Sequence, residues 1–339
     1  MIDEIGVATV TYGNRGSLIE KTVRTAQASG IKHFCIVDNG STKESKKVLR
    51  KLATDPFIKV ITMKCNMGSS LGFKTAIQGV ESISEVKYVF CLDDDNLISF
   101  DTPGILLNRI CSGEVLFCLR YYDKDFLMKT DKELEVKRLE NFILNKNSYS
   151  YFSLAKMFPM IKEFFIKRVP NEKKRYRMVC GGQGGMFFHK SIINRVGYQD
   201  TDYFLYYDDI EYSYRMHKLG LKLYMIPECE ITDQETTLVN SGVKSYFQIS
   251  SILENIRNMN NMKLHYGYRN RVVLEYKLIT NHILYNINRS IVKCLIFPVI
   301  KILYYMKYKE INRIKEIEAA IKEGEEIGKQ KTNIFERIL

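Results

Sequence analysis

The first hundred residues alternate short apolar runs with amphipathic segments, and this alternation constrains the possible folds more than any other feature of the chain. We predict strands at the apolar runs, residues 6–12, 34–37, 59–63 and 88–92. Between them we predict helices at residues 17–29, from a cap at Ser41 or Thr42 onward, and at 70–80. Helices that alternate with strands in this way are typical of βα units on a parallel sheet, so the sequence predicts an α/β fold.

The predicted strands run directly into polar residues. Asp38 follows the second strand, and Asp93, Asp94 and Asp95 follow the fourth. Because the carboxyl ends of parallel strands meet at one edge of a sheet, we expect these side chains to gather there. Ligands of open α/β sheets bind at that edge, which makes it the first place to look for a functional site.

The rest of the chain carries weaker patterns. We expect a helical insertion at about 123–177, sheet-like structure at 178–189, a helix at 204–219 and a strand at 221–226. From residue 246 onward the pattern is helical and basic, and 310–331 alternates charges as a solvated helix does. These patterns predict two domains, an α/β domain at residues 1–240 and a basic helical region at residues 241–339.

Composition narrows the class of protein. Of 339 residues, 45% are hydrophobic and 27% are charged, which is typical of a folded globular protein. The 51 Lys and Arg against 39 Asp and Glu give a net charge of +12, which attracts phosphates, nucleic acid or an anionic membrane surface. Charge alone leaves these three partners open.

The cysteines and the chain start point to a reducing compartment. None of the eight cysteines forms a C-x-x-C pair, so we expect free and mostly buried thiols. The chain opens without a basic and apolar export signal, so we expect a cytoplasmic protein. The most apolar late stretch, 291–305, is interrupted by Lys293 and Lys301, and from the sequence we expect no membrane-spanning segment.

Three adjacent aspartates, Asp93 to Asp95, form the first candidate site. Neighbouring carboxylates raise one another's pKa unless a cation compensates them. Oxygen ligands of this kind suit Mg²⁺ or Mn²⁺, usually shared with substrate phosphates. A solvated acidic turn is the alternative, but it is less expected at the end of a buried strand.

Asp208 and Asp209 form the second candidate site, after the aromatic run 203–207. An aspartate held beside an acceptor hydroxyl can serve as a general base. Two acids at a helix start also suit the helix dipole, so capping remains open as an alternative, although a cap needs only one of them.

Two glycine-containing loops let the backbone approach a ligand closely, at 181–185 and at 66–72. The second precedes a helix and is suited to a phosphate, yet no Gly-Lys-Ser/Thr follows as in a P-loop. No G-x-G-x-x-G, paired histidine motif or G-x-S-x-G elbow is present, which argues against dinucleotide binding, zinc and serine hydrolysis.

Six motifs together carry a family resemblance: residues 10–15, 37–41, 66–68, 93–95, 181–185 and 208–209. In this order and spacing they resemble family 2 glycosyltransferases of the GT-A fold, over about residues 5–235. The resemblance implies a Rossmann-like, mostly parallel mixed sheet flanked by helices. The later Tyr268-Arg269-Asn270 is similar to an element of the rhamnosyl- and galactofuranosyltransferase-like branch.

The resemblance implies a role for each matched residue. The nucleotide donor would be held by Thr11, Tyr12, Arg15, Asp38, Asn66, Gly68, Asp93 and Asp94. A Mn²⁺ or Mg²⁺ ion would be held by Asp95 and Asp93. Asp209 would remove the proton of the acceptor hydroxyl. Asp208 would orient that hydroxyl or contact the sugar. The acceptor or sugar would contact Gly182, Gln183, Gly184, Tyr207 and Arg269.

The sequence departs from the family pattern at the third metal ligand, where a histidine is common and Asp233 stands here. A carboxylate ligates Mn²⁺ or Mg²⁺ as well, so we expect Asp233 either to complete the site or to lie on the surface. The chain also lacks tryptophan, which leaves tyrosines and phenylalanines of 203–207 to stack on a sugar.

The resemblance predicts an inverting, metal-dependent transfer from a nucleotide-diphospho-sugar, with UDP or dTDP as the expected nucleotide, to a glycan or lipid-linked glycan of a bacterial cell surface. The basic C-terminal helices would rest on the inner face of the membrane or meet a second subunit of a homo-oligomer. A sugar nucleotidyltransferase is one alternative, but only one glycine follows the first strand. A nucleic-acid-binding protein is the other, but it leaves the aspartates unexplained, and we expect no nucleic-acid partner.

Overall fold

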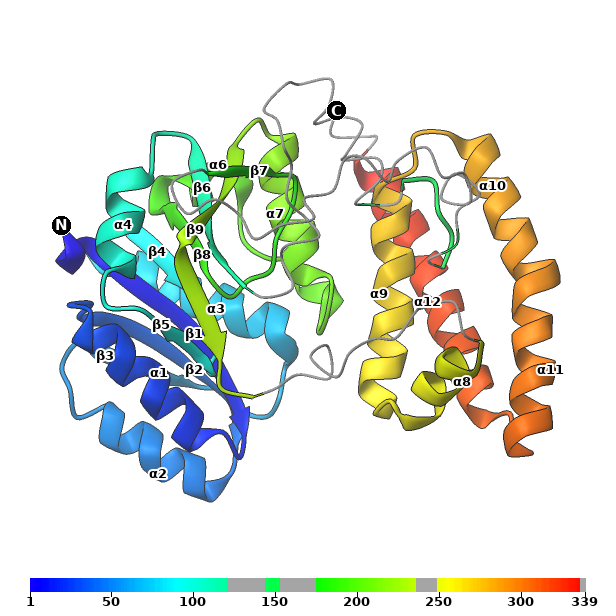
Figure 1. Ribbon diagram of the computed structural model, residues 1–339, viewed down its shortest axis with the longest axis horizontal. Coiled ribbons are helices and arrows are strands. Elements are labelled where there is room, and N and C mark those ends of the chain that lie inside the picture. Colours follow the sequence, from blue (N-terminus) through cyan, green and yellow to red (C-terminus); the bar gives the residue numbers. More distant parts are fainter. Residues whose placement is uncertain (121–143, 145, 151, 153–174, 236–248, 336–339) are drawn as a thin grey trace. The chain divides into compact units, whose positions relative to one another are not determined.

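The computed structural model describes residues 1–120, 144, 146–150, 152, 175–235 and 249–335 (Figure 1). Contacts divide these residues into two compact units. The first contains 1–120, 175–204 and 208–235, and the second contains 205–207, 249–335 and the short pieces between 144 and 152. The helical insertion expected at 123–177 lies almost wholly outside the described residues.

The alternating pattern of the first hundred residues forms the predicted elements. The strands are β1 (Ile5–Gly13), β2 (His33–Ser41), β3 (Ile58–Thr62) and β4 (Tyr88–Cys91). The helices between them are α1 (Gly16–Ala28), α2 (Lys43–Leu52) and α3 (Gly68–Glu81). Thr42 caps α2 by accepting a hydrogen bond from the Ser45 N–H, as expected. The α/β prediction is therefore confirmed, although β2 continues through residues 38–41, where we expected it to stop.

The remaining strands complete a mixed sheet. They are β5 (Asn96–Ile98), β6 (Glu114–Leu119), β7 (Tyr176–Met178), β8 (Met186–His189) and β9 (Lys222–Asp233). The order is β3-β2-β1-β4-β8-β6-β9-β5, with β7 also paired to β9. β1 is parallel to β2 and β4, and β6 is parallel to β9, whereas β8 is antiparallel to both of its neighbours. The expected mixed sheet is confirmed, but it is not mostly parallel, because four of the strand pairs among the described residues are parallel and four are antiparallel.

Helices cover both faces of this sheet and bury its side chains in two clusters. α3, α6 (Ile193–Val196) and α7 (Asp208–Lys218) cover one face, with Phe73, Ile77 and Tyr212 among the buried contacts. α1, α2 and α4 (Thr102–Arg109) cover the other. Burial of both faces explains why the central strands are nearly continuous apolar runs.

Two predicted boundaries are wrong in ways that matter for the site. We expected a helix from residue 204, but α7 begins at Asp208, and Phe204, Tyr206 and Tyr207 have positive φ angles of 57°, 67° and 64°. We expected a strand at 221–226, but β9 continues to Asp233 and pairs with β5. Asp233 is therefore a strand residue and is largely buried.

The second unit is helical, as expected. It contains α8 (Ile249–Asn258), α9 (Asn261–Lys277), α10 (His282–Ile291), α11 (Phe297–Tyr308) and α12 (Asn312–Phe335). α12 packs along α9 and buries Ile314, Ile317 and Ile321 in the core of the unit. The expectation of a merely solvated helix at 310–331 is therefore wrong, because its apolar side chains face α9.

A π-helical turn, Val292–Ile296, joins α10 and α11 into one helix, His282–Tyr308. Among the described residues this is the one helix that is long and apolar enough to cross a membrane. The sequence expectation of no such segment is wrong on that criterion, because the continuous helix is longer than the stretch between Lys293 and Lys301.

Candidate active site at the carboxyl edge of the sheet

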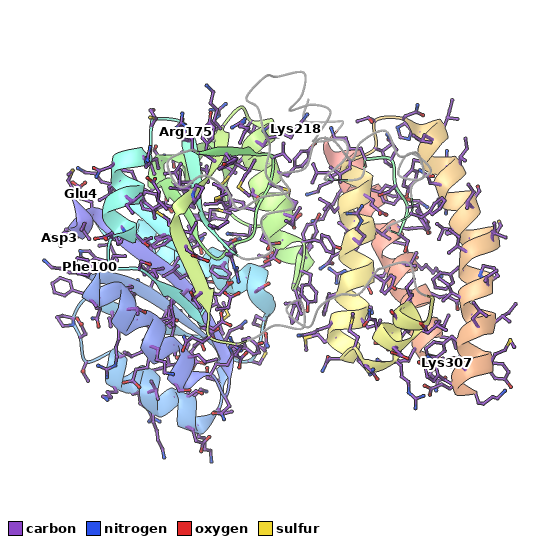
Figure 2. The ribbon with its side chains drawn as sticks, in the orientation of Figure 1. Asp3, Glu4, Phe100, Arg175, Lys218 and Lys307 are labelled. Atoms are coloured by element: carbon purple, nitrogen blue, oxygen red, sulfur yellow. The ribbon has the colours of Figure 1, made fainter. Side chains whose placement is uncertain are left out.

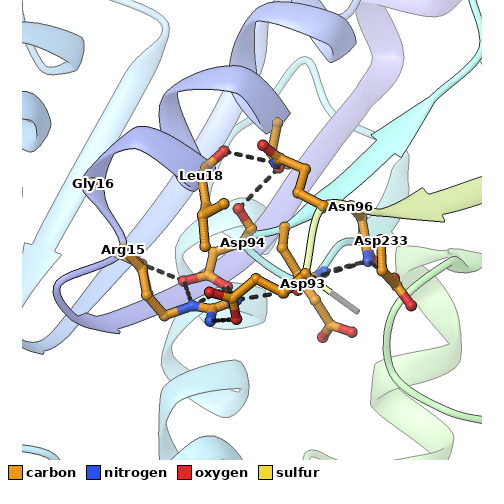
Figure 3. A network of polar contacts seen from close by, with 12 residues as sticks. Arg15, Gly16, Leu18, Asp93, Asp94, Asn96 and Asp233 are labelled. Atoms are coloured by element: carbon orange, nitrogen blue, oxygen red, sulfur yellow. Dashed lines mark hydrogen bonds and ion pairs between the residues drawn. The ribbon is translucent and has the colours of Figure 1, made fainter. Parts of the chain in front are cut away.

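The carboxyl edge of the sheet gathers the first group of predicted residues. Asp93 to Asp95 follow β4, and Arg15 follows β1, the strand beside it. The pairing of β5 with β9 sets Asp233 opposite Asn96. Figure 3 shows the result, with Arg15, Asp93, Asp94, Asn96 and Asp233 in one polar network. Side chains separated by more than a hundred residues thus meet at the predicted edge.

Asp94 is the buried centre of this network. It accepts hydrogen bonds from Thr11 Oγ1 at 2.7 Å and from Arg15 Nε at 2.9 Å, and Arg15 Nη2 lies 2.8 Å from its other oxygen. Burial raises the pKa of Asp94, while the hydrogen bonds and charge of Arg15 act to lower it. Burial acts to lower the pKa of Arg15, but Asp94, Glu235 and Asp95 raise it. Because a guanidinium keeps its proton and the contacts are short, we treat the pair as ionised.

Arg120 joins Asp93 to Asp233. Its Nη1 donates to Asp93 at 2.8 Å and its Nη2 donates to Asp233 at 2.9 Å. A Cβ at Gly184 would lie 2.5 Å from Asp93 Oδ2 and 2.6 Å from Arg120 Nη1. A side chain at this position would displace the ends of Asp93 and Arg120, so glycine lets the loop pass close to this ion pair.

Among the described residues, this edge gathers more acidic than basic side chains. Asp93, Asp94, Asp95, Asp233 and Glu235 lie in ion pairs with two guanidinium groups, those of Arg15 and Arg120. Burial and the charge of Asp93 raise the pKa of Asp95 to about 6, and Asp94 and Asp233 contribute to that shift. Such a concentration of carboxylates favours the binding of a cation.

In the described residues, no three His, Cys, Asp or Glu side chains converge to hold a metal ion. Two carboxylates do lie close together, because Asn96 Nδ2 donates to Asp95 Oδ1 at 3.5 Å and to Asp233 Oδ1 at 2.8 Å. Mg²⁺ is commonly held by one or two carboxylates together with substrate phosphates. Asp95 and Asp233 have oxygens of the type that such an ion binds, and Asp233 Oδ1 also accepts a hydrogen bond from Arg120.

Asp208 and Asp209 begin α7 and lie in a different electrostatic setting. Asp208 is buried and accepts a hydrogen bond from Ser69 Oγ at 3.0 Å. Burial and the neighbouring charge of Asp209 raise the pKa of Asp208. Burial and the charge of Asp93 raise the pKa of Asp209, and the charge of Arg120 acts to lower this pKa. A carboxylate with a raised pKa accepts a proton more readily at neutral pH.

Asp209 is the more accessible of the two acids, and it faces the glycine loop. A Cβ at Gly182 would lie 3.6 Å from Asp209 Oδ2, and Asp209 Oδ1 accepts from the Ile210 N–H at 2.7 Å. The Ser213 hydroxyl, one turn along α7, accepts a hydrogen bond from the Gly181 N–H and donates one to the Gly181 carbonyl, each at 2.9 Å. The loop and α7 are thereby held together, which sets Asp209 beside the predicted sugar-binding residues.

Asn66 and Gly68, predicted to bind the donor, make contacts that support the second acid pair. Asn39 holds this loop by accepting from the Met67 N–H at 2.7 Å and donating to the Gly68 carbonyl at 2.9 Å. Gly68 has φ of +86°, and a Cβ there would lie 2.2 Å from the Phe204 carbonyl oxygen. The structure therefore brings this loop against the segment that leads into Asp208.

Other predicted residues have contacts of their own. Asp38 is buried and accepts from the Ser41 N–H at 2.8 Å, whereas Tyr12 is 47% exposed with the Arg15 guanidinium 5.5 Å from its ring centre. Gln183 is buried and accepts a hydrogen bond from Gln199 Nε2 at 3.3 Å. An open tyrosine ring beside an arginine is suited to stacking on a nucleotide base.

Tyr207 and Arg269, predicted to contact the acceptor, both belong to the helical unit. Arg269 pairs with Glu323 of α12 at 3.2 Å, and its guanidinium lies 4.8 Å from the ring centre of Tyr266. Asn270 donates to the carbonyls of Leu205 and Tyr206 at 2.6 and 3.0 Å. Their role toward an acceptor remains a prediction.

Sequence reasoning missed Arg120, Asn96 and Ser69. Arg120 directly follows the apolar strand β6, so the strand-end rule that selected the aspartates applies to it equally. Asn96 follows the three aspartates and acts through the short strand β5, which no sequence pattern indicated. Ser69 lies within a predicted motif but contacts Asp208, 139 positions away, so only the tertiary structure reveals it.

A mixed sheet carries an acid cluster at the carboxyl edge of its strands and an acid pair at the start of α7, which is an arrangement suited to a charged ligand. The family model described as glycosyl transferase family 2 matches residues 7–193, more than half of the chain. The chain belongs to this family of glycosyltransferases.

Comparison with solved structures gives similar folds at low identity. Residues 1–349 of S. aureus TarS match with a TM-score of 0.47 and 11% identity, over 95% of this chain and 92% of that chain. A second structure of S. aureus TarS matches with a TM-score of 0.48 and 12% identity, over 94% of this chain and 55% of that chain. A structure of GalNAc-T7 with UDP, GalNAc and Mn²⁺ matches with a TM-score of 0.43 and 15% identity, over 68% of this chain and 43% of that chain. No curated protein matches the sequence.

Proposed function

We propose that this enzyme transfers a glycosyl residue, with inversion, from a nucleotide-diphospho-sugar to a hydroxyl group of a glycan or lipid-linked glycan. The observation that carries the proposal is the pairing of two unlike acidic sites on one unit. Asp93 to Asp95 carry arginine partners and an excess of charge, whereas Asp208 and Asp209 are a carboxylate pair with raised pKa values. The first suits the leaving diphosphate and the second suits proton removal.

On the donor side, Tyr12 would stack on the base, and Arg15 and Arg120 would approach the diphosphate as the donor binds. A bound Mg²⁺ or Mn²⁺ on Asp95 and Asp233 would neutralise charge that develops on the leaving group. Guanidinium groups are well suited to phosphate oxygens because they donate two parallel hydrogen bonds. We propose UDP or dTDP as the nucleotide, and a galactofuranosyl or rhamnosyl group as the first sugar to try.

On the acceptor side, Asp209 would take the proton of the attacking hydroxyl. The acceptor oxygen forms a bond to the anomeric carbon, the bond from that carbon to the diphosphate oxygen breaks, and the nucleoside diphosphate leaves with the electron pair. One in-line displacement of this kind inverts the anomeric carbon. Burial and the charge of Asp93 keep the pKa of Asp209 raised, and Asp208 would orient the acceptor or contact the sugar.

The cellular setting that we propose is the cytoplasmic side of a bacterial membrane, in the assembly of a surface polysaccharide. In residues 249–335, 15 Lys and Arg stand against 8 Asp and Glu, which suits an anionic membrane surface.

A thermal-shift screen of UDP, dTDP and GDP, with their common sugars and with or without Mn²⁺, tests the donor site. A ligand at about 100 times its dissociation constant adds about 2.7 kcal/mol of stability. We expect a Mn²⁺-dependent shift with one nucleotide. Folded protein that shifts with none of them would contradict the donor assignment.

The variant Asp209→Asn tests the base. It keeps the shape of the side chain but removes its basicity, so we expect transfer to fall by about 10²- to 10⁴-fold while the donor affinity stays within about twofold. The matched control is Asp101→Asn, an exposed aspartate of the same unit, which should leave both unchanged. Full transfer by Asp209→Asn would move the base to Asp208.

A further inference from the structure

The long helix His282–Tyr308 has one apolar face that the described residues leave open. Its exposed apolar side chains are those of Ile283, Ile287, Leu295, Val299, Ile302 and Met306, with exposures between 44% and 74%, and Tyr305 at 53%. Sixteen large hydrophobic side chains of the described residues are exposed, and seven of them lie on this helix. Such a concentration on one element marks an interaction surface.

The opposite face of the same helix is packed within its own unit. Tyr285, Val292 and Tyr304 are buried there among the residues of the helical core. Arg289 and Lys293 pair with Glu325 of α12 at 2.7 and 2.9 Å. The helix is therefore amphipathic, with one face fixed to α12 and the other apolar.

The charged residues of the helix are all basic, and the unit that contains it is basic as a whole. Its four basic side chains are 35–41% exposed, and each pairs with a glutamate of α8 or α12. Lys307, which pairs with Glu254 of α8, is labelled in Figure 2. Residues 249–335 contain 15 Lys and Arg against 8 Asp and Glu, a net charge of +7. An exposed apolar face on a unit of net positive charge complements a surface of anionic lipid headgroups.

Length and composition would also allow this helix to cross a membrane, but its contacts argue against that. Crossing would carry Glu325 and Glu318, which pair with Lys293 and Lys301, into the hydrocarbon together with α12. α12 carries a charged residue at nearly every turn, and charges inside a bilayer are costly. A helix with one ion-paired face and one apolar face is stable lying in the interface.

We propose that the helix His282–Tyr308 lies in the surface of an anionic bilayer, with its apolar face among the lipids and the basic unit at the headgroups. A second copy of the chain suits this face less well, because a two-fold contact would bring together two units that each carry a net charge of +7. The inference does not depend on which sugar is transferred, and vesicle binding is measured independently of donor binding.

Flotation of the full chain with vesicles tests the proposal. Vesicles of phosphatidylcholine with about 30% phosphatidylglycerol are compared with phosphatidylcholine alone, at low and high salt. We expect binding to the mixed vesicles that falls about tenfold or more without phosphatidylglycerol, and that weakens with salt. The double variant Leu295→Gln with Ile302→Gln should lower binding at least tenfold, because both side chains are about 60% exposed and fold stability does not depend on them.

The control variant is Phe100→Gln, which removes a 72% exposed aromatic ring from the first unit (Figure 2). It should bind vesicles like the unmodified chain. No flotation at low salt, or an equal loss in the control, would overturn the proposal. Protein that stays in the vesicles after an alkaline carbonate wash would show a spanning helix instead. A dimer in sedimentation that the double variant dissociates, without vesicle binding, would assign the face to a second copy.

Discussion

Asp94 and Asp208 are equally buried, each only 4% exposed, yet their partners differ in charge. Asp94 contacts the guanidinium of Arg15 and the hydroxyl of Thr11, whereas Asp208 contacts the hydroxyl of Ser69 and lies beside a second acid, Asp209. Burial disfavours the charge of both carboxylates, but only Asp94 has a cation to offset it. Equal burial therefore gives one carboxylate a fixed charge and the other a titratable one.

This difference separates two chemical tasks at one end of the sheet. A fixed ion pair orients groups for a charged ligand, and it should be needed for stability as well as for donor binding. A titratable pair is suited to taking a proton but destabilises the fold when ionised. The same substitution, aspartate to asparagine, should therefore have opposite effects on stability at the two positions.

The largest stability effect is expected for Asp94→Asn. The variant removes the negative partner of a guanidinium that is 15% exposed, so we expect a loss of about 3 kcal/mol in the free energy of unfolding. Urea denaturation at neutral pH measures this, with Asp101→Asn as the exposed control. A loss no greater than that of the control would show that Asp95 and Glu235 satisfy Arg15 without Asp94.

Glu325 of the helical unit is a third buried carboxylate to compare with Asp94 and Asp208, and three side chains donate hydrogen bonds to it. Arg289, Lys293 and Tyr149 donate to it at 2.7, 2.9 and 2.9 Å. Burial acts to raise the pKa of Glu325, but these hydrogen bonds outweigh burial and lower it to about 2.

We therefore expect Glu325→Gln to cost about 2 kcal/mol of stability at neutral pH. Because the pKa is lower in the folded state, this contribution is present above pH 4.5, the ordinary value, and is lost as the pH falls toward 2. Thermal unfolding between pH 3 and 7 measures the difference, with Glu326→Gln on the same helix as the control. A cost independent of pH would show lost packing rather than a lost ion pair.

The smallest effect has the opposite sign. The pKa of Asp208 is raised by burial, so its ionised form is less stable in the folded state than in the unfolded state. Stability should therefore fall as the pH rises above the ordinary aspartate value, and Asp208→Asn should gain about 1 kcal/mol at pH 8. Thermal unfolding at pH 8 and pH 5 measures this gain, which should shrink at the lower pH. Destabilisation at both values would show that Ser69 needs a charged partner.

Much of the first unit could be predicted because its local and tertiary signals agree. The apolar run before Asp93 forms β4, so Asp93 to Asp95 lie where the pattern places them, whereas Asp38 lies inside β2. The family model confirms the glycosyltransferase resemblance. The apolar pattern was sufficient for β1, β2 and β4, but it did not predict β6, which is buried along its whole length.

The predictions from the sequence were wrong where contacts between distant residues determine the local structure. We expected residues 204–207 to begin a helix. Phe204 instead contacts Gly68 and Ser70 at the start of α3, more than a hundred positions away, and Phe204, Tyr206 and Tyr207 have positive φ angles. Glu325 appeared to be one of many solvated charges, but the packing of α12 buries it beneath α10 and Tyr149. Neither contact leaves a periodic signal in the sequence.

The pH dependence of the transfer rate, measured for the unmodified enzyme and for Asp93→Asn at saturating donor, tests the central claim most directly. Asp209 must be ionised to accept a proton, and its pKa is raised, so activity should fall with decreasing pH at a higher pH than an ordinary aspartate would give. The charge of Asp93 contributes to the raised pKa of Asp209, so Asp93→Asn should move this fall in activity to lower pH. A fall at the same pH in both folded proteins would contradict Asp209 as the proton acceptor.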